Sequence, residues 1–349
     1  MLQSFGKRKK LYLENKLIMN IAQKAAESIK KAKTIIIFHH VAPDGDGLGS
    51  SLALREMISQ LDSVNKLDAV ITGKIPDTYK FLPGIESLKK SNESSLHQSY
   101  DLAIALDCAC KDRLGDAEEL FNNARSTLNI DHHISDDGFA DIDWIEPKAS
   151  ATGEILFKLI EPLGVKLTQN IAIGLYTAIL TDTGGFKFEN TKAETFKICA
   201  ELLAAGADPV NIYNRCYESK PLAMVQLHAR AIDNAIYLEN NEIVYTKITR
   251  KLLEEINASD DHIDGITEAL RQIDSVKIAL VFKETTRGTT KVSFRSNGIN
   301  VCEIASFFGG GGHKLASGCL LEKNIEDTVN DVITTVRKQV IKARVHDFV

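Results

Sequence analysis

Acidic and histidine side chains follow three apolar segments of the sequence and could together bind divalent cations. They are His40, Asp44 and Asp46 after residues 34–38, Asp107 after residues 102–106, and Asp131, His132 and His133 after residues 127–130. Carboxylates crowded together repel one another unless a cation lies among them. Carboxylate and imidazole ligands in combination suit Mn²⁺, Zn²⁺ or Fe²⁺. There are more carboxylates than one ion can use, so the pattern predicts two neighbouring ions with shared ligands.

A further candidate ligand, Asp182, lies in the turn segment 181–186. Two divalent ions lower the pKa of water, so hydroxide becomes available near neutral pH. Hydroxide would attack a phosphorus atom in line while the ions offset charge on the phosphoryl oxygens. These residues therefore predict metal-assisted hydrolysis of phosphoesters, without a Ser or Cys nucleophile and without a covalent intermediate.

The segments that precede these side chains have the pattern of buried strands. Residues 34–38, 102–106 and 127–130 are short and apolar, whereas residues 48–61 and 168–180 have helical periodicity. Strands that alternate with helices predict an α/β fold with a mostly parallel sheet covered by helices on both faces. Ligands bind at the carboxyl ends of the strands in such sheets, so we expect the polar side chains to meet at one edge.

The sequence pattern changes near residue 240, where a smaller α/β region begins. Residues 242–248, 276–282 and 291–294 have the pattern of strands, with helices between them. A length of 349 residues suits two domains. We expect three parts of the chain: a catalytic domain over residues 1–215, a helical connector over 216–240 and a second domain over 241–349.

The second domain contains a run of four glycines followed by a histidine. These residues are Gly309, Gly310, Gly311, Gly312 and His313. Glycines adopt backbone dihedrals closed to other residues and can expose consecutive N–H groups to an anion. Arg295, which precedes Ser296, could hold a phosphate through two parallel hydrogen bonds, and His313 could stack on a base. Substrate contact by these residues is the preferred interpretation, and a tight turn is the alternative for the glycines.

Composition excludes several classes of protein. A net charge of −5 is unsuited to coating long nucleic acid, although a short nucleotide has few phosphates to neutralise. The six cysteines include no CxxC pair, which favours reduced, buried thiols over a disulfide framework. No secretory signal or membrane-spanning run is present, so we expect a cytoplasmic protein without a membrane partner.

These residues together resemble the motifs of the DHH phosphoesterase superfamily. The resemblance is carried by His40-x-x-x-Asp44-x-Asp46, Asp107, Asp131-His132-His133 and Asp182, and it covers about residues 34–190. Arg295-Ser296, the glycine run with His313, and Ala316-Ser317-Gly318 make the second domain similar to a DHHA1 substrate-binding domain. That form of the domain occurs in oligoribonucleases (nanoRNases) that also dephosphorylate 3′-phosphoadenosine 5′-phosphate (pAp). Gly47 and Ser317 depart from the usual residues, but neither departure removes a ligand.

The resemblance implies a role for each matching residue. His40 and Asp44 would hold one metal ion, and Asp46 and His132 the other. Asp107 and Asp182 would reach both ions. His133 would face the substrate phosphate, stabilising charge or protonating the leaving oxygen, and Asp131 would orient the neighbouring histidines.

The resemblance also implies the substrate class. The expected enzyme removes mononucleotides from RNAs a few residues long and converts pAp to AMP, using Mn²⁺, with Mg²⁺, Co²⁺ or Fe²⁺ as alternatives. A phosphodiesterase for linear or cyclic dinucleotides, such as pApA or c-di-AMP, is the nearest alternative. A non-catalytic nucleotide-binding regulatory module is the alternative from a different class. A homodimer formed through the first domain is also expected.

Other polar residues near these motifs have simpler interpretations. Arg113, six residues after Asp107, could support the metal-binding edge or form a surface salt bridge. Asp260, Asp261 and His262 imitate a metal-binding triplet, but no strand precedes them, so we exclude them as ligands.

Overall fold

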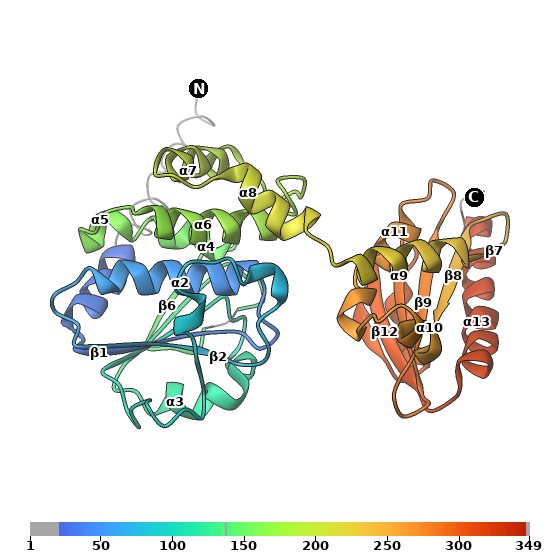
Figure 1. Ribbon diagram of the computed structural model, residues 1–349, viewed down its shortest axis with the longest axis horizontal. Coiled ribbons are helices and arrows are strands. Elements are labelled where there is room, and N and C mark those ends of the chain that lie inside the picture. Colours follow the sequence, from blue (N-terminus) through green and yellow to red (C-terminus); the bar gives the residue numbers. More distant parts are fainter. Residues whose placement is uncertain (1–20, 137, 347–349) are drawn as a thin grey trace. The chain divides into compact units, whose positions relative to one another are not determined.

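The computed structural model describes residues 21–136 and 138–346, with side chains through residue 341. The chain divides after Ser219 into two compact units, Met1–Ser219 and Lys220–Val349 (Figure 1). Each unit contains its own six-stranded sheet.

The sheet of the first unit is parallel throughout, with the strand order β3-β2-β1-β4-β5-β6. Its strands are β1 (Thr34–His39), β2 (Lys66–Ile71), β3 (Lys89–Lys90), β4 (Leu102–Leu106), β5 (Thr127–Asp131) and β6 (Ile142–Ile145). The three strands predicted to carry the ligands, β1, β4 and β5, are neighbours at the centre. The register pairs His39 with Leu106 and Leu106 with Ile130, so these strands end side by side.

Helices cover both faces of this sheet, as the alternating pattern predicted. In Figure 1, α2, α4 and α6 lie on one side of the sheet and α3 on the other. The α-helices are residues 21–31, α2 (Gly45–Ser59), α3 (Glu118–Asn122), α4 (Thr152–Phe157), α5 (Ile160–Leu163), α6 (Gln169–Asp182), α7 (Ala193–Ala204) and α8 (Pro209–Tyr213). Short 3₁₀ helices are η1 (Asp77–Tyr79), η2 (Ile85–Ser87) and η3 (Lys111–Ala117), and η4 (Asn214–Glu218) is a π-helix.

Apolar cores fill both interfaces between the sheet and its helices. Ile37 and Ile104 belong to the core on the α2 side, and Phe38 and Phe121 belong to the core on the α3 side. Successive side chains of a strand point to opposite faces of the sheet, so Ile37 and Phe38 of β1 enter different cores. Burial on both faces explains why these strands are apolar throughout rather than alternating.

Two helices of the first unit touch through their backbones. A Cβ atom on Gly49 of α2 would overlap the carbonyl oxygen of Gly174 in α6, and one on Gly45 would overlap the Thr181 side chain. Glycine is therefore required at both positions of α2 for this close approach. The contacts place the first turn of α2 beside the last turn of α6, which ends at Asp182.

The second unit has a mixed sheet with the order β11-β12-β10-β9-β8-β7, in which only the pair β8–β9 is parallel. Leu227 and Ala231 of α9 belong to a core on one face, and α12 and α13 contribute to a core on the other. The strands are β7 (Ile236–Leu238), β8 (Ile243–Ile248), β9 (Ile278–Glu284), β10 (Thr290–Ser296), β11 (Gly311–His313) and β12 (Ala316–Leu321). The helices are α9 (Leu222–Asp233), α10 (Arg250–Glu255), α11 (Ile266–Arg271), α12 (Val301–Phe307) and α13 (Ile325–His346), with the 3₁₀ helix η5 (Asp260–Ile263).

The predicted fold class is confirmed: a mostly parallel sheet covered by helices, followed by a smaller α/β unit. In the part of the chain that the structure describes, no helix is both long enough and apolar enough to span a membrane.

Candidate metal centre

The loop after β1 and the first turn of α2 supply three candidate ligands. His40 is buried, and its Nε2 lies 3.3 Å from Asp44 Oδ2. Asp44 is the N-cap of α2, where its Oδ1 accepts a hydrogen bond from the Gly47 N–H at 3.0 Å. Asp46 lies in the first helical turn and is almost fully buried. Helix formation at this point therefore fixes both carboxylates next to the strand end.

Asp107 lies between two histidines. It follows β4 with a left-handed φ of 57°, which is uncommon for a residue with a side chain. One oxygen, Oδ2, is 3.4 Å from His40 Nε2, and the other, Oδ1, is 3.6 Å from His132 Nε2. A carboxylate whose two oxygens face different imidazoles has the geometry of a ligand shared by two ions.

His132 also faces two further carboxylates. Its Nε2 lies 3.7 Å from Asp46 Oδ2 and 3.4 Å from Asp182 Oδ2. Asp182 reaches this position from the end of α6, which the glycine contacts with α2 hold in place.

The structure thus brings all six predicted ligands together. Their ligand atoms form two groups able to hold a metal ion: His40, Asp44 and Asp107, and Asp46, His132 and Asp182. Asp182, which was expected to reach both ions, belongs to the second of these groups and to no other candidate group among the described residues. A third grouping combines Asp107 and His132 with His133.

The charges at this edge favour a bound cation. Burial, together with the negative charges of Asp107 and Asp182, raises the pKa of Asp46 well above its usual range. Burial raises the pKa of Asp182 to about 6, and neighbouring carboxylates add to the increase. Burial alone would lower the pKa of His40, but hydrogen bonds to Asp107 and Asp44 outweigh it and raise the pKa to about 10. Without a cation, these carboxylates resist ionisation and the imidazole retains a proton. This is expected of a site whose side chains are arranged to surround a positive charge. The donor set fits divalent metal ions.

His133 points one ring nitrogen at Asp131. Its Nδ1 lies 2.8 Å from Asp131 Oδ1, and this hydrogen bond raises the His133 pKa. Asp131 is fully buried, whereas the His133 side chain is 43% exposed. The hydrogen bond orients the imidazole and leaves Nε2 as the nitrogen able to meet a substrate.

The sequence did not reveal the support that α4 gives to Asp46. The N–H groups of Thr152 and Gly153 donate to the two oxygens of Asp46 at 2.7 and 3.1 Å. Ser50 adds a third hydrogen bond at 2.9 Å. The sequence signal was the small and polar segment 150–153 at the start of a helix, which does not by itself indicate a partner.

Arg295 of the second unit is held by neighbouring groups. Its Nε donates to Glu268 Oε1 at 2.7 Å, and its Nη1 donates to the Phe294 carbonyl at 2.9 Å. Ser296 is buried, and its hydroxyl donates to the Ile299 carbonyl.

The glycine run has two structural parts. Gly309 has a left-handed φ of 74° after α12, and Gly311 begins β11, which ends at His313. A Cβ on Gly310 would overlap the Gly318 carbonyl, and one on Gly312 would crowd β12. A Cβ on Gly311 would meet nothing within 4 Å, so the fold does not require glycine there. Gly311, Gly312 and His313 are exposed.

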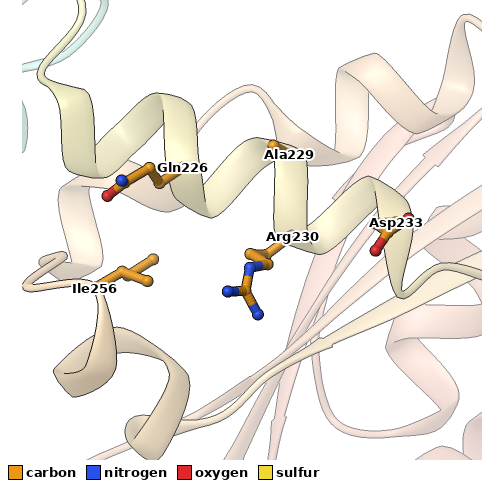
Figure 2. Close-up of a pocket in the computed structure, with 5 residues that line it drawn as sticks. All are labelled: Gln226, Ala229, Arg230, Asp233 and Ile256. Atoms are coloured by element: carbon orange, nitrogen blue, oxygen red, sulfur yellow. The ribbon is translucent and has the colours of Figure 1, made fainter.

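The acidic and histidine triplet 260–262 of the second unit does not form a candidate metal-binding group. None of the three candidate metal groups found among the described residues includes Asp260, Asp261 or His262. Asp260 instead pairs with Arg250 at 3.0 Å. Figure 2 shows a pocket beside α9, lined by Gln226, Ala229, Arg230, Asp233 and Ile256.

Comparison with known proteins places this geometry in a family. The model of the DHH family, N-terminal domain, matches residues 34–179, and that of the DHHA1 domain matches residues 240–342. A probable bifunctional oligoribonuclease and PAP phosphatase NrnA from Streptococcus mutans is 31% identical, over 83% of this chain and 90% of that protein. The chain belongs to the DHH–DHHA1 family. This membership confirms the resemblance found in the sequence.

Two further matches cover nearly the whole chain. The bifunctional oligoribonuclease and PAP phosphatase NrnA from Thermus thermophilus is 31% identical, over 91% of this chain and 94% of that protein. The crystal structure of an exopolyphosphatase-related protein from Bacteroides fragilis superposes with a TM-score of 0.81 at 25% identity, covering 93% of this chain and 96% of that chain.

Proposed function

We propose that this chain is a metal-dependent phosphoesterase that hydrolyses very short oligoribonucleotides to mononucleotides and pAp to AMP. The observation that carries the proposal is the pair of adjacent ligand groups. Asp107 links them, because its two carboxylate oxygens face His40 of one group and His132 of the other. The names of relatives that share 31% identity supply the substrate class.

Two divalent ions, Mn²⁺ in our proposal, would occupy the groups. When bound, they supply activated water and offset charge on the phosphoryl oxygens. Carboxylate and imidazole ligands together suit Mn²⁺. Asp107 would be shared, while His40 and Asp44 would hold one ion and Asp46, His132 and Asp182 the other.

The remaining residues of the edge would act on the substrate. His133, oriented by Asp131, would hold or donate a proton at the leaving oxygen through Nε2. The N–H groups of Thr152 and Gly153 keep Asp46 from turning away from its ligand position.

The second unit would bind one end of the substrate. Arg295 retains N–H groups beyond those directed at Glu268 and Phe294, and these can donate to a phosphate. Gly311 supports a close approach of substrate to the backbone, because the fold itself leaves space for a side chain there. His313 is exposed beside it and would contact a base or phosphate.

A hydrolysis panel tests the proposal. The purified protein is incubated with Mn²⁺ and with pAp, pApA, c-di-AMP, RNA and DNA of two to five nucleotides, and pyrophosphate. Release of AMP from pAp and of mononucleotides from the short RNAs is expected. Preferential cleavage of the dinucleotides would favour the alternative substrate class, and binding without turnover would favour a regulatory module.

We also propose that two copies associate through α7 of the first unit. Phe196 and Leu203 are 54% and 40% exposed on this helix. Light scattering should give twice the chain mass for the wild type and the chain mass for Phe196→Glu. A monomeric wild type would contradict this proposal.

A further inference from the structure

Arg113 is an exposed arginine held beside the candidate ligand His40. Its carbonyl accepts a hydrogen bond from the Val41 N–H at 2.8 Å. Gly115, with a left-handed φ of 54°, packs so closely on Val41 that a Cβ would overlap it. These contacts fix the backbone of η3 against the loop that carries His40, and the guanidinium Nη2 lies 3.1 Å from His40 Nδ1.

His40 cannot accept a hydrogen bond from the Arg113 guanidinium. Its Nδ1 lies 2.7 Å from the Val41 carbonyl oxygen, a separation at which the nitrogen must carry a proton and donate it. Because Nδ1 keeps its proton, Nε2, which faces Asp44 and Asp107, is the ring nitrogen that could bind a metal ion. A protonated Nδ1 cannot accept a hydrogen bond from Arg113.

A surface salt bridge does not explain Arg113 either. Among the residues that the structure describes, no carboxylate forms an ion pair with it. Arg125, another exposed arginine of the same unit, does have such a partner, because its Nη1 lies 3.1 Å from Asp101. Arg113 is therefore a cation placed at the metal-binding edge without an acidic partner.

We propose that Arg113 donates hydrogen bonds to a non-bridging oxygen of the phosphoryl group that is hydrolysed. The inference rests on the proposed phosphoesterase function. The four carboxylates of the ligand groups would balance the charge of two divalent ions, so a further cation would add to the charge that the ions offset on the phosphoryl oxygens. A guanidinium can donate two parallel hydrogen bonds to phosphate, and it stabilises charge best where that charge grows in the transition state.

The test compares Arg113→Ala and Arg113→Lys with the wild type, with pAp as substrate and Mn²⁺ varied. Arg113→Ala should lower kcat/KM about 100-fold, mostly through kcat. Arg113→Lys should retain only a small part of the wild-type kcat/KM, because lysine lacks the planar guanidinium that donates two parallel hydrogen bonds. Added guanidinium should restore part of the Arg113→Ala rate, while the Mn²⁺ concentration for half-activation stays unchanged. Wild-type rates in both variants, or a loss fully reversed by excess Mn²⁺, would overturn the inference.

Arg125→Ala is the matched control and should keep the wild-type rate. If the wild type hydrolyses neither pAp nor short RNA, the proposed function fails, and the same variants are compared for equilibrium binding of pAp. Binding at least about tenfold weaker in Arg113→Ala than in Arg125→Ala would still support the arginine contact, and equal binding would reject it.

Discussion

The candidate metal-binding edge of the first unit and the glycine segment of the second, residues 309–313, differ in how firmly the fold holds their side chains and backbone in place. Asp46 and Asp107 are almost fully buried, and hydrogen bonds from α4 hold Asp46. Gly311 and His313 are exposed, and the space around Gly311 is open. Ligands for ions must be rigid before the ion binds, whereas a surface that receives a nucleotide can remain open until the nucleotide arrives. Substitutions at the edge should therefore affect turnover, and those in the glycine segment should affect binding.

The largest expected effect comes from Asp107→Asn. The amide retains the volume of the side chain but loses the charge facing His40 and His132, so kcat should fall by about 10⁴-fold or more. Turnover of pAp and the circular dichroism spectrum check this prediction. Substantial turnover in a folded variant would remove Asp107 from its shared position.

His133→Ala should have the next largest effect. It removes the oriented imidazole but no member of the two main ligand groups, so kcat should fall by about 10²- to 10³-fold. Bound Mn²⁺, measured by equilibrium dialysis, should stay at two ions per chain. Loss of one ion would instead assign His133 to the third grouping, with Asp107 and His132.

Arg295→Ala should mainly weaken substrate binding. We expect KM for pAp to rise about tenfold with kcat little changed, because a charge-assisted hydrogen bond to the substrate is lost. Glu268→Gln should give a smaller increase, since it removes only the carboxylate that orients Arg295. A loss confined to kcat in Arg295→Ala would contradict the contrast between the two regions.

The smallest effect is expected for Gly311→Ala, with Gly310→Ala as its control. The Gly311 methyl group enters open space, so the melting temperature should stay the same while KM rises a few-fold. Gly310→Ala should lower the melting temperature, because its methyl group would overlap the Gly318 carbonyl. Unchanged KM in Gly311→Ala would show that substrate does not approach this backbone.

The sequence predicted which side chains meet at the edge of the sheet, but not the hydrogen bonds that hold them there. Three apolar segments predicted strands, and they do pair side by side in the sheet: residues 34–38, 102–106 and 127–130. Because the carboxyl ends of parallel strands meet at one edge, His40, Asp107 and His132 could be placed together from the sequence alone. Thr152 could not be linked to Asp46, because a hydrogen bond across 106 positions of the chain has no local pattern. The sequence also could not show that no described carboxylate pairs with Arg113, because this depends on which residues surround its side chain in space.

The backbone contact between Gly49 and Gly174 has a consequence for the spacing of the two candidate ligand groups. Asp44 and Asp46 belong to the start of α2 and Asp182 to the end of α6, so the separation of these helices sets how far apart the opposing carboxylates stand. Gly49→Ala would force the helices apart although residue 49 touches no ligand atom. In the proposed two-ion site, the ion held by Asp46, His132 and Asp182 should then bind more weakly, although no ligand is removed. A glycine in the interior of a helix would thus influence metal affinity.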